Sequence, residues 1–204
     1  MPDYYPVALD LGGRRCLVVG GGPVAARKAE GLLRAGAAVT VIAPDVVPAL
    51  AARPGLTVER RPYRRGDVAG FRLVITATGR PEVDAAVFAD GEAAGIWVNS
   101  ADDRDHCSFI LPSVHRDGTV TVAVSTGGVS PALASWLRRR LAAQTAGAGT
   151  LAELLGQARD RLRAEGRSTE DTDWAALLDG PLPGLVRAGD LDGAWALLQQ
   201  AVGP

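Results

Sequence analysis

The sequence contains few of the residues that build metal centres and disulfide frameworks. Among its 204 residues there are two cysteines and two histidines. Cys16 and Cys107 form no CxxC pair, and His106 and His115 complete no zinc-binding pattern. We therefore expect no resident metal ion, and a reducing, cytoplasmic compartment as the setting of the protein.

Long apolar runs and an excess of one charge are missing as well. The first residues, Met-Pro-Asp-Tyr-Tyr-Pro, do not have the pattern of a secretory signal, and no apolar stretch approaches the length of a membrane span. The formal net charge is −1 at pH 7, so bulk electrostatics indicate neither nucleic acid nor a membrane as a partner. Lys28 is the single lysine, so any basic patch consists of arginine, which suits the bidentate recognition of carboxylates.

The strongest local signal is a glycine turn that follows an apolar run. Leu17–Val19 predict a strand buried on both faces, and Gly20, Gly22 and Ala25 then match the pattern G-x-G-x-x-G/A. Pro23 stands at the expected first position of a helix, where its missing N–H is not needed, and the remaining N–H groups are available to an anion. The stretch predicts a dinucleotide site. The alternative is a glycine turn in a flavodoxin-like fold without a ligand.

Strands and helices are predicted to alternate through the first half of the chain. Further strands are expected at residues 38–42, 56–59, 71–77 and 96–98, and helices at 24–34, 44–52 and 81–94. This spacing favours an α/β fold with a parallel, doubly wound sheet of the Rossmann type.

The pattern changes after Asn99. Residues 118–124 alternate and predict one more strand, followed by a helix over about 132–142. Residues 144–150 are rich in Ala and Gly and predict a joint, and the remainder has helical spacing only. We expect a dinucleotide-binding domain over residues 1–112, a connecting segment over 113–145 and a helical C-terminal domain over 146–204.

Residues after the second and fourth predicted strands lie where a Rossmann cofactor binds. Asp45 is a candidate for the ribose hydroxyls, although it is displaced into the loop; the alternative is a solvated helix N-cap. No arginine follows that strand closely enough to hold a 2′-phosphate, which favours NAD over NADP. Thr78, between Ala77 and Gly79, is expected beside the cofactor too.

The loop after the fifth predicted strand carries acids and a histidine. Asn99 opens the loop, and the candidates for general acid or base chemistry are Asp102, Asp103, Asp105 and His106. The loop belongs to the carboxyl edge of the sheet, where ligands bind in such folds, and catalysis needs one such group within reach of the substrate. The alternative is a charged surface loop capped by Asp and Asn.

A second turn leads from a strand into a helix. The hydroxyl and N–H groups of Ser125, Thr126, Gly127 and Ser130 are placed to hold a carboxylate or a phosphate. The alternative is an ordinary serine cap with Pro131 at the first helical position.

Several stretches, taken in order, resemble one family. They are residues 5–11, residues 18–25 with Arg27 and Lys28, Asn99 with Asp102, residues 107–112 and residues 122–131. Together they resemble the precorrin-2 dehydrogenase/sirohydrochlorin ferrochelatase family, whose module also forms the N-terminal part of siroheme synthase. The resemblance covers about residues 4–142. No methyltransferase domain follows, so the sequence resembles the stand-alone form.

The resemblance implies NAD-dependent oxidation of the tetrapyrrole precorrin-2 to sirohydrochlorin, for siroheme or cobalamin synthesis. Some members of the family also insert Fe²⁺ into sirohydrochlorin, so the resemblance implies this second activity as an option, with Co²⁺ as an alternative metal substrate. It further implies a homodimer, with residues 113–142 crossing between subunits. A NAD-sensing regulator without dehydrogenase activity is the alternative, although no basic face or DNA-binding module supports it.

The resemblance also assigns individual residues. The family's functional aspartate corresponds to Asp102, and the NAD contacts correspond to Pro23, Val24, Pro44 and Asp45. Peripheral carboxylates of the substrate are expected at the candidates Asn99, Ser125, Thr126, Gly127 and Ser130. Thr126 stands where some siroheme synthases have serine, and the hydroxyl is kept.

Overall fold

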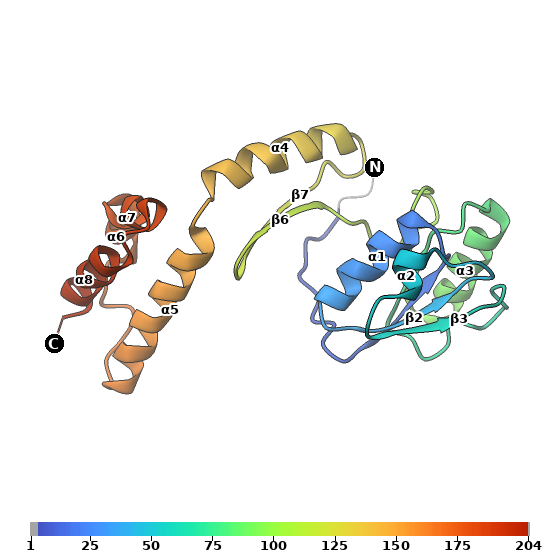
Figure 1. Cartoon of the computed structure of the whole chain (residues 1–204), viewed down its shortest axis with the longest axis horizontal. Coiled ribbons are helices and arrows are strands. Elements are labelled where there is room, and N and C mark those ends of the chain that lie inside the picture. Colours follow the sequence, from blue (N-terminus) through green and yellow to red (C-terminus); the bar gives the residue numbers. More distant parts are fainter. Residues whose placement is uncertain (1–3, 204) are drawn as a thin grey trace. The chain divides into compact units, whose positions relative to one another are not determined.

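The computed structural model describes residues 4–203 and divides the chain into two compact units, Met1–Leu111 and Pro112–Pro204 (Figure 1). The first unit contains a parallel sheet with helices. The second unit contains a hairpin followed by helices only. Across residues 4–203, none of the helices has the length and apolar composition needed to cross a bilayer.

The first unit is organised around a five-stranded parallel sheet. Its strands are β1 (Arg15–Val19), β2 (Ala38–Ile42), β3 (Leu56–Glu59), β4 (Leu73–Thr76) and β5 (Trp97–Ser100). Their order is β3-β2-β1-β4-β5, so the chain runs outward from β1 to β3 and then returns to the other side of β1. The topological switch point therefore lies between β1 and β4, where doubly wound folds bind their ligands.

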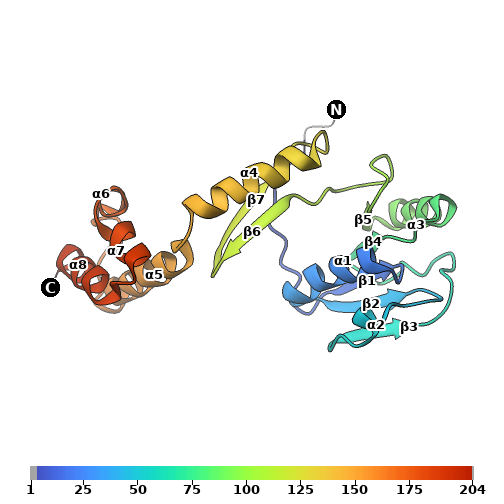
Figure 2. The same ribbon diagram turned by 45° about the horizontal axis from the view of Figure 1, so that its top comes forward.

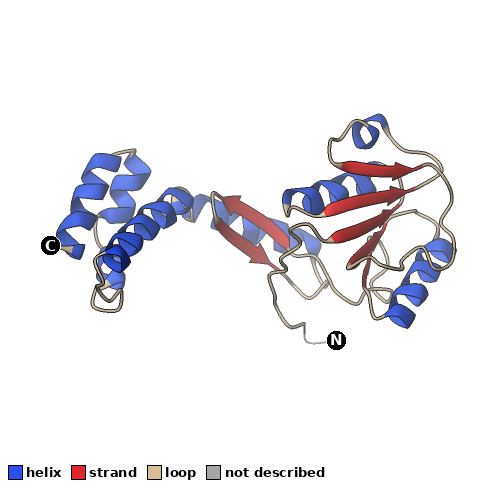
Figure 3. Ribbon diagram, turned by 90° about the horizontal axis from the view of Figure 1, so that it is seen from below, coloured by secondary structure: helices blue, strands red, loops and turns tan. Residues whose placement is uncertain are grey.

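Helices cover both faces of this sheet (Figure 3). The helices are α1 (Pro23–Arg34), α2 (Pro48–Ala51) and α3 (Pro81–Ala94). Val18 of β1 belongs to an apolar cluster with Ala25 and Ala29 of α1, whereas Val19 belongs to a second cluster with Val87 of α3. Because both faces are buried, β1 shows a continuous apolar run rather than alternation. The predicted Rossmann-type fold is confirmed.

Several boundaries in the first unit differ from the prediction, and β4 is shorter than expected, at Leu73–Thr76 instead of 71–77. The helix expected from Pro44 begins at Pro48, because the preceding loop passes over the glycine turn and the N–H of Val47 donates to the Gly21 carbonyl at 2.9 Å. The N-cap of α2 is Val47, so the interpretation of Asp45 as a helix cap is wrong. Strand β5 also extends through Asn99 and Ser100.

The second unit begins with an antiparallel hairpin of β6 (Ser113–Asp117) and β7 (Val120–Val124). Helix α4 (Pro131–Gln144) packs along this hairpin (Figure 2). The helices α5 (Ala148–Ala164), α6 (Trp174–Asp179), α7 (Leu182–Ala188) and α8 (Leu191–Val202) then enclose an apolar core of their own.

Strand β6 was not predicted, and the joint between α4 and α5 is shorter than the predicted residues 144–150. Asp117-Gly118 is a hairpin-turn dipeptide and marks the end of β6. Helix α5 begins at Ala148, inside the predicted joint, and a side chain at Gly149 would collide with the Asp117 carbonyl. The start of α5 therefore packs directly on the hairpin turn.

Candidate functional site

Three consecutive glycines form the turn between β1 and α1, and only one of them faces open space. Gly20 has φ +127°, and a side chain there would collide with the Ala77 carbonyl. A side chain at Gly21 would collide with the Asp45 carbonyl, whereas a Cβ at Gly22 would meet nothing within 4 Å. Packing within the unit thus requires the first two glycines. The third keeps the backbone accessible to a ligand.

The helix that follows starts without a protein group to cap it. Gly22 is the N-cap of α1 and provides no side-chain acceptor, Pro23 follows it, and the first turn contains no acid. The first N–H groups of a helix have no acceptor within the helix. Those of Val24 and Ala25, together with the positive end of the helix dipole, suit an anion such as a pyrophosphate. The turn therefore fits the phosphates of a dinucleotide.

The loop after β2 forms one surface with the glycine turn. The Asp45 carbonyl packs on Gly21, and the Val47 N–H donates to Gly21 at 2.9 Å. The side chains of Pro44 and Asp45 are exposed beside this contact. The structure thus brings the expected cofactor residues of the first two loops together and leaves the Asp45 carboxylate accessible to hydroxyl groups.

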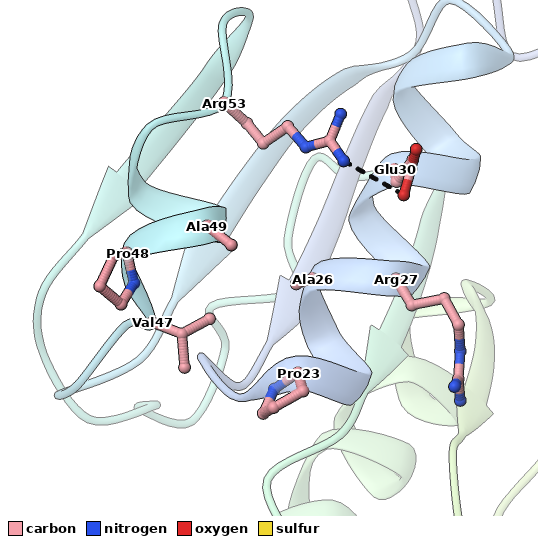
Figure 4. Close-up of a pocket in the computed structure, with 8 residues that line it drawn as sticks. All are labelled: Pro23, Ala26, Arg27, Glu30, Val47, Pro48, Ala49 and Arg53. Carbon is pink, nitrogen blue, oxygen red and sulfur yellow. Dashed lines mark ion pairs between the residues drawn. The ribbon is translucent and has the colours of Figure 1, made fainter.

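A groove of about 570 Å³ adjoins the turn on the helical layer, between α1 and α2 (Figure 4). It is lined by Pro23, Ala26, Arg27, Glu30, Val47, Pro48, Ala49 and Arg53. Arg53 reaches across to Glu30 at 3.2 Å, while Arg27 points away from Val47 and Pro48. One arginine of the groove is therefore neutralised and the other is turned away from the loop after β2.

Thr78 follows β4, and its hydroxyl is directed into the protein. It donates to Asp84 Oδ1 at 2.7 Å and accepts from the Arg80 N–H at 3.0 Å. Asp84 is buried, with 9% exposure, and was not among the candidates predicted from the sequence. The signal in the sequence that could have identified Asp84 is an acid in the first turn of a helix that follows the dipeptide Thr78-Gly79.

Asn99, at the end of β5, fixes the returning loop. It is 5% exposed, and its Nδ2 donates to the Phe109 carbonyl at 3.0 Å. Within residues 4–203, its Oδ1 and the hydroxyl of Ser100 are buried without a hydrogen-bond partner. The Ser108 N–H donates to the Val98 carbonyl at 2.8 Å, so this segment covers the free edge of β5. A direct contact of Asn99 with substrate stays a prediction.

The acids of the loop after β5 differ in their partners. Asp103 Oδ2 lies 2.6 Å from Nδ1 of His106, and this hydrogen bond is the main cause that lowers the pKa of Asp103. The Asp102 side chain is exposed and has no hydrogen bond to any described residue. Of the two, Asp102 is the carboxylate still available to a substrate.

Lys28 is a neighbour of Asp102 that the sequence analysis did not select. Burial lowers the pKa of Lys28 and repulsion from Arg27 lowers it further, while Cys107 and Asp102 act in the opposite direction. The single lysine of the chain, on α1, therefore shares the electrostatic environment of the loop after β5. Burial also raises the pKa of Cys107, so its thiol is not an activated nucleophile.

The four remaining candidates form the turn between β7 and α4 in the second unit. Ser130 Oγ accepts from the Leu133 N–H at 3.2 Å, as a helix cap does. Thr126 Oγ1 accepts from the Ser130 N–H and donates to the Ser130 carbonyl, both at 3.0 Å. The Gly127 N–H donates to Ser125 Oγ at 3.1 Å. The alternative of a serine cap is thus observed, and the Ser125 side chain is the exposed hydroxyl of the turn.

Comparison with known proteins gives matches along nearly the whole chain. It is 40% identical to a siroheme synthase of Chromobacterium violaceum, over 98% of this chain and 44% of that protein. It is 42% identical to a siroheme synthase of Methylococcus capsulatus, over 98% of this chain and 43% of that protein. The chain therefore spans less than half the length of these relatives. The structure is similar to that of SirC, a precorrin-2 dehydrogenase, with a TM-score of 0.76, 26% identity and coverage of 98% of each chain.

Two family models match consecutive parts of the sequence. Residues 117–144 match the model described as "Sirohaem biosynthesis protein central". Residues 7–113, more than half of the chain, match the model described as "Putative NAD(P)-binding" and include the glycine turn and the loops after β2, β4 and β5. The chain therefore belongs to this NAD(P)-binding family, and the resemblance to siroheme synthases is confirmed.

Proposed function

We propose that this protein is an NAD-dependent precorrin-2 dehydrogenase that forms sirohydrochlorin in siroheme synthesis. The observation that carries the proposal is the glycine turn, where Gly22 opens onto free space at a helix end without a side-chain cap. The activity named for SirC and the similarity to siroheme synthases over 98% of the chain support the choice of substrate.

Different residues of the first unit bind different parts of the dinucleotide. The N–H groups of Val24 and Ala25 hold the pyrophosphate beside Gly22, and the carboxylate of Asp45 accepts hydrogen bonds from ribose hydroxyls. When bound, NAD supplies the acceptor for the hydride that leaves the substrate. Arg53 is paired with Glu30, and Arg27 points away from Val47 and Pro48, so neither arginine of the groove is directed at the loop after β2, which favours NAD over NADP.

Oxidation of the substrate also releases a proton. We assign its acceptance to Asp102, whose exposed carboxylate has no hydrogen bond to a described residue and lies two residues beyond the end of β5, nearer to the strand than the exposed Asp105. The ammonium of Lys28, in the same unit as Asp102, binds a peripheral carboxylate of the tetrapyrrole, which carries eight of them. In the second unit, the exposed hydroxyl of Ser125 is a separate candidate for such a carboxylate. Thr126, Gly127 and Ser130 act by shaping the turn that presents Ser125.

A homodimer is part of the proposal. Leu133 and Trp136 lie near the start of α4 and Val129 lies in the turn just before it, and the three are 46%, 46% and 60% exposed. Exposed apolar side chains grouped in this way suit burial against a second copy of the chain. A change of Leu133 to Glu is expected to convert dimers to monomers in sedimentation experiments.

The free cysteines Cys16 and Cys107 support a cytoplasmic location.

The decisive assay combines purified protein, NAD and enzymatically generated precorrin-2 without oxygen, and follows NADH and sirohydrochlorin by absorbance. We expect the two to form in equal amounts. Addition of Fe²⁺ or Co²⁺ afterwards tests whether the protein also consumes sirohydrochlorin. Binding of NAD without any NADH formation would instead favour a NAD-sensing regulator.

The proton acceptor is tested with a matched pair of variants in the same loop. Asp102→Asn is expected to lower kcat about 100-fold or more, whereas Asp105→Asn, another exposed acid, is expected to leave it unchanged. Full turnover by Asp102→Asn would remove this role from Asp102.

A further inference from the structure

Asp84 is a buried carboxylate beside the end of β4, one of the two strands at the switch point, and it has no role in the proposed reaction. Asp84 Oδ1 accepts hydrogen bonds from the hydroxyls of Thr76 and Thr78, the latter at 2.7 Å. The Thr78 N–H also points to it, at 3.4 Å. Thr76 is fully buried and Asp84 is 9% exposed. One oxygen of Asp84 is therefore the shared hydrogen-bond acceptor for residues 76–78, at the end of β4.

The position of Asp84 on its helix makes a buried charge tolerable. It lies in the first turn of α3, whose N-cap, Arg80, provides no side-chain acceptor. The N-terminal end of a helix stabilises negative charge, and two hydroxyl donors replace the water that the carboxylate loses on burial. Asp84 thus ties the start of α3 to the end of β4.

The segment held by Asp84 is also the support of the glycine turn. Ala77 lies between the two threonines, and its carbonyl occupies the place where Gly20 would carry a side chain. The Ala77 N–H donates to the Val19 carbonyl at 2.8 Å, directly before the turn. A shift of the segment would therefore move the backbone of the turn that holds the pyrophosphate.

We propose that Asp84 is a positioning residue for the dinucleotide, acting through Thr76 and Thr78 to hold residues 76–78 against the glycine turn. The inference rests on the proposed function, because it concerns the same cofactor site. It also gives Thr78 a specific role. Since its hydroxyl is engaged by Asp84, Thr78 serves the cofactor through its backbone rather than through its side chain.

The test is calorimetric titration of the full chain with NAD, which needs no substrate. Asp84→Ala removes the acceptor and is expected to raise the Kd for NAD about tenfold, the effect of losing one well-formed hydrogen-bonded constraint. Asp84→Asn keeps an oxygen that accepts from both hydroxyls, so its Kd is expected to stay within about twofold of the parent value. Thr78→Val keeps the carboxylate and removes one donor, and a smaller rise is expected. It also serves as the test if Asp84→Ala does not fold.

Asp90 provides the control for general loss of stability. It lies on the same helix, accepts hydrogen bonds from the Tyr63 hydroxyl at 2.6 Å and the Gly66 N–H at 2.9 Å, and forms an ion pair with Arg65. Asp90→Ala is expected to lower the urea midpoint while the Kd for NAD stays unchanged.

Three results would overturn the inference: an unchanged Kd in Asp84→Ala, an equal loss of affinity in Asp84→Asn, or an equal loss in Asp90→Ala. Failure of the parent protein to bind NAD would instead count against the proposed function. The two failures are therefore distinguishable.

Discussion

Two turns of this protein have the same order of elements, but one leaves the following helix without a side-chain cap and the other caps it. The turn between β1 and α1 and the turn between β7 and α4 each lead from a strand into a helix with proline at its first position. In the first, the N-cap is Gly22 and no side chain caps the helix. In the second, the N-cap is Ser130, and its hydroxyl accepts from the Leu133 N–H at 3.2 Å.

The difference lies in where each turn finds its packing partners. The carbonyls of Ala77 and Asp45, from other loops of the unit, pack against Gly20 and Gly21. Those contacts hold the first turn in place without any side chain of the turn itself, so the first N–H groups of α1 keep no side-chain acceptor. The second turn is held by its own hydroxyl groups, so one of its helix N–H groups already has an acceptor. A helix end is thus open to an anion when the turn before it is stabilised from elsewhere.

The largest effect is expected when the first turn is given the cap of the second. Gly22→Ser is free of steric conflict, since a Cβ there meets nothing within 4 Å, and its hydroxyl would satisfy an N–H group of α1. We expect the affinity for NAD to fall about 10- to 100-fold with no loss of thermal stability. Calorimetry and thermal unfolding measure the two effects. Unchanged NAD affinity in Gly22→Ser would refute the assignment of the open helix end.

Gly21→Ser is the matched control for that change. A side chain there collides with the Asp45 carbonyl, so the loop after β2 must move. Thermal unfolding is expected to show a clear loss of stability in this variant alone. Equal stability of the two serine variants would contradict the packing described for the turn.

The reciprocal change in the second turn is expected to affect stability instead of NAD binding. Ser130→Ala removes the cap of α4 and is expected to reduce the free energy of unfolding by about 1 kcal/mol. The Kd for NAD should stay within about twofold of the parent value, because this hydroxyl only accepts from the chain itself. Urea titration and calorimetry on the same sample check the pair, and a loss of NAD affinity as large as that of Gly22→Ser would erase the contrast.

The first unit is also expected to respond to acid through its carboxylates. Burial alone would raise the pKa of Asp90, but hydrogen bonds from Tyr63, Gly66 and Arg65 outweigh it, so the pKa lies below its ordinary value of 3.8. A lowered pKa in the folded state gives stability that is complete above the ordinary value and disappears as the pH falls through the folded value. The stability difference between the parent and Asp90→Asn should therefore be largest near neutral pH and shrink below pH about 4. A difference that is independent of pH in urea titrations would contradict this account.

The smallest effect concerns the choice between NAD and NADP. Glu30→Gln removes the partner of Arg53 and frees a guanidinium at the groove beside the first turn. Because such exposed ion pairs are weak, we expect at most about a twofold improvement in the Kd for NADP and none for NAD. Glu30 also pairs with Arg34, at 3.5 Å, so Arg53→Ala serves as the control that abolishes any gain. A gain for NADP that persists in the double variant would have another cause.

The local parts of the site could be predicted from the sequence, whereas the parts that depend on burial could not. Gly20, Gly22 and Pro23 lie within one short stretch, so their spacing alone identifies the turn. Asp84 and Glu82 are both acids in the first turn of α3, and only the fold shows that one of them is buried under Thr76. The role of Gly21 likewise depends on the Asp45 carbonyl, which packing brings in from another loop.

The fold shows the same division. Strands β1 and β4 were predicted because burial on both faces gives continuous apolar runs. Strand β6 was missed because Ser113–Asp117 contains polar residues with little alternation, and half-buried positions give no clear pattern. The start of α2 was misplaced because a single backbone contact, from Val47 to Gly21, decides where the loop ends.

The most direct test of the glycine turn as the dinucleotide site is the exchange of its backbone amide protons, followed by NMR with and without NAD. We predict that saturating NAD slows the exchange of the Val24 and Ala25 amides, which have no acceptor within the helix. Unchanged exchange of these two amides under saturating NAD would contradict the account.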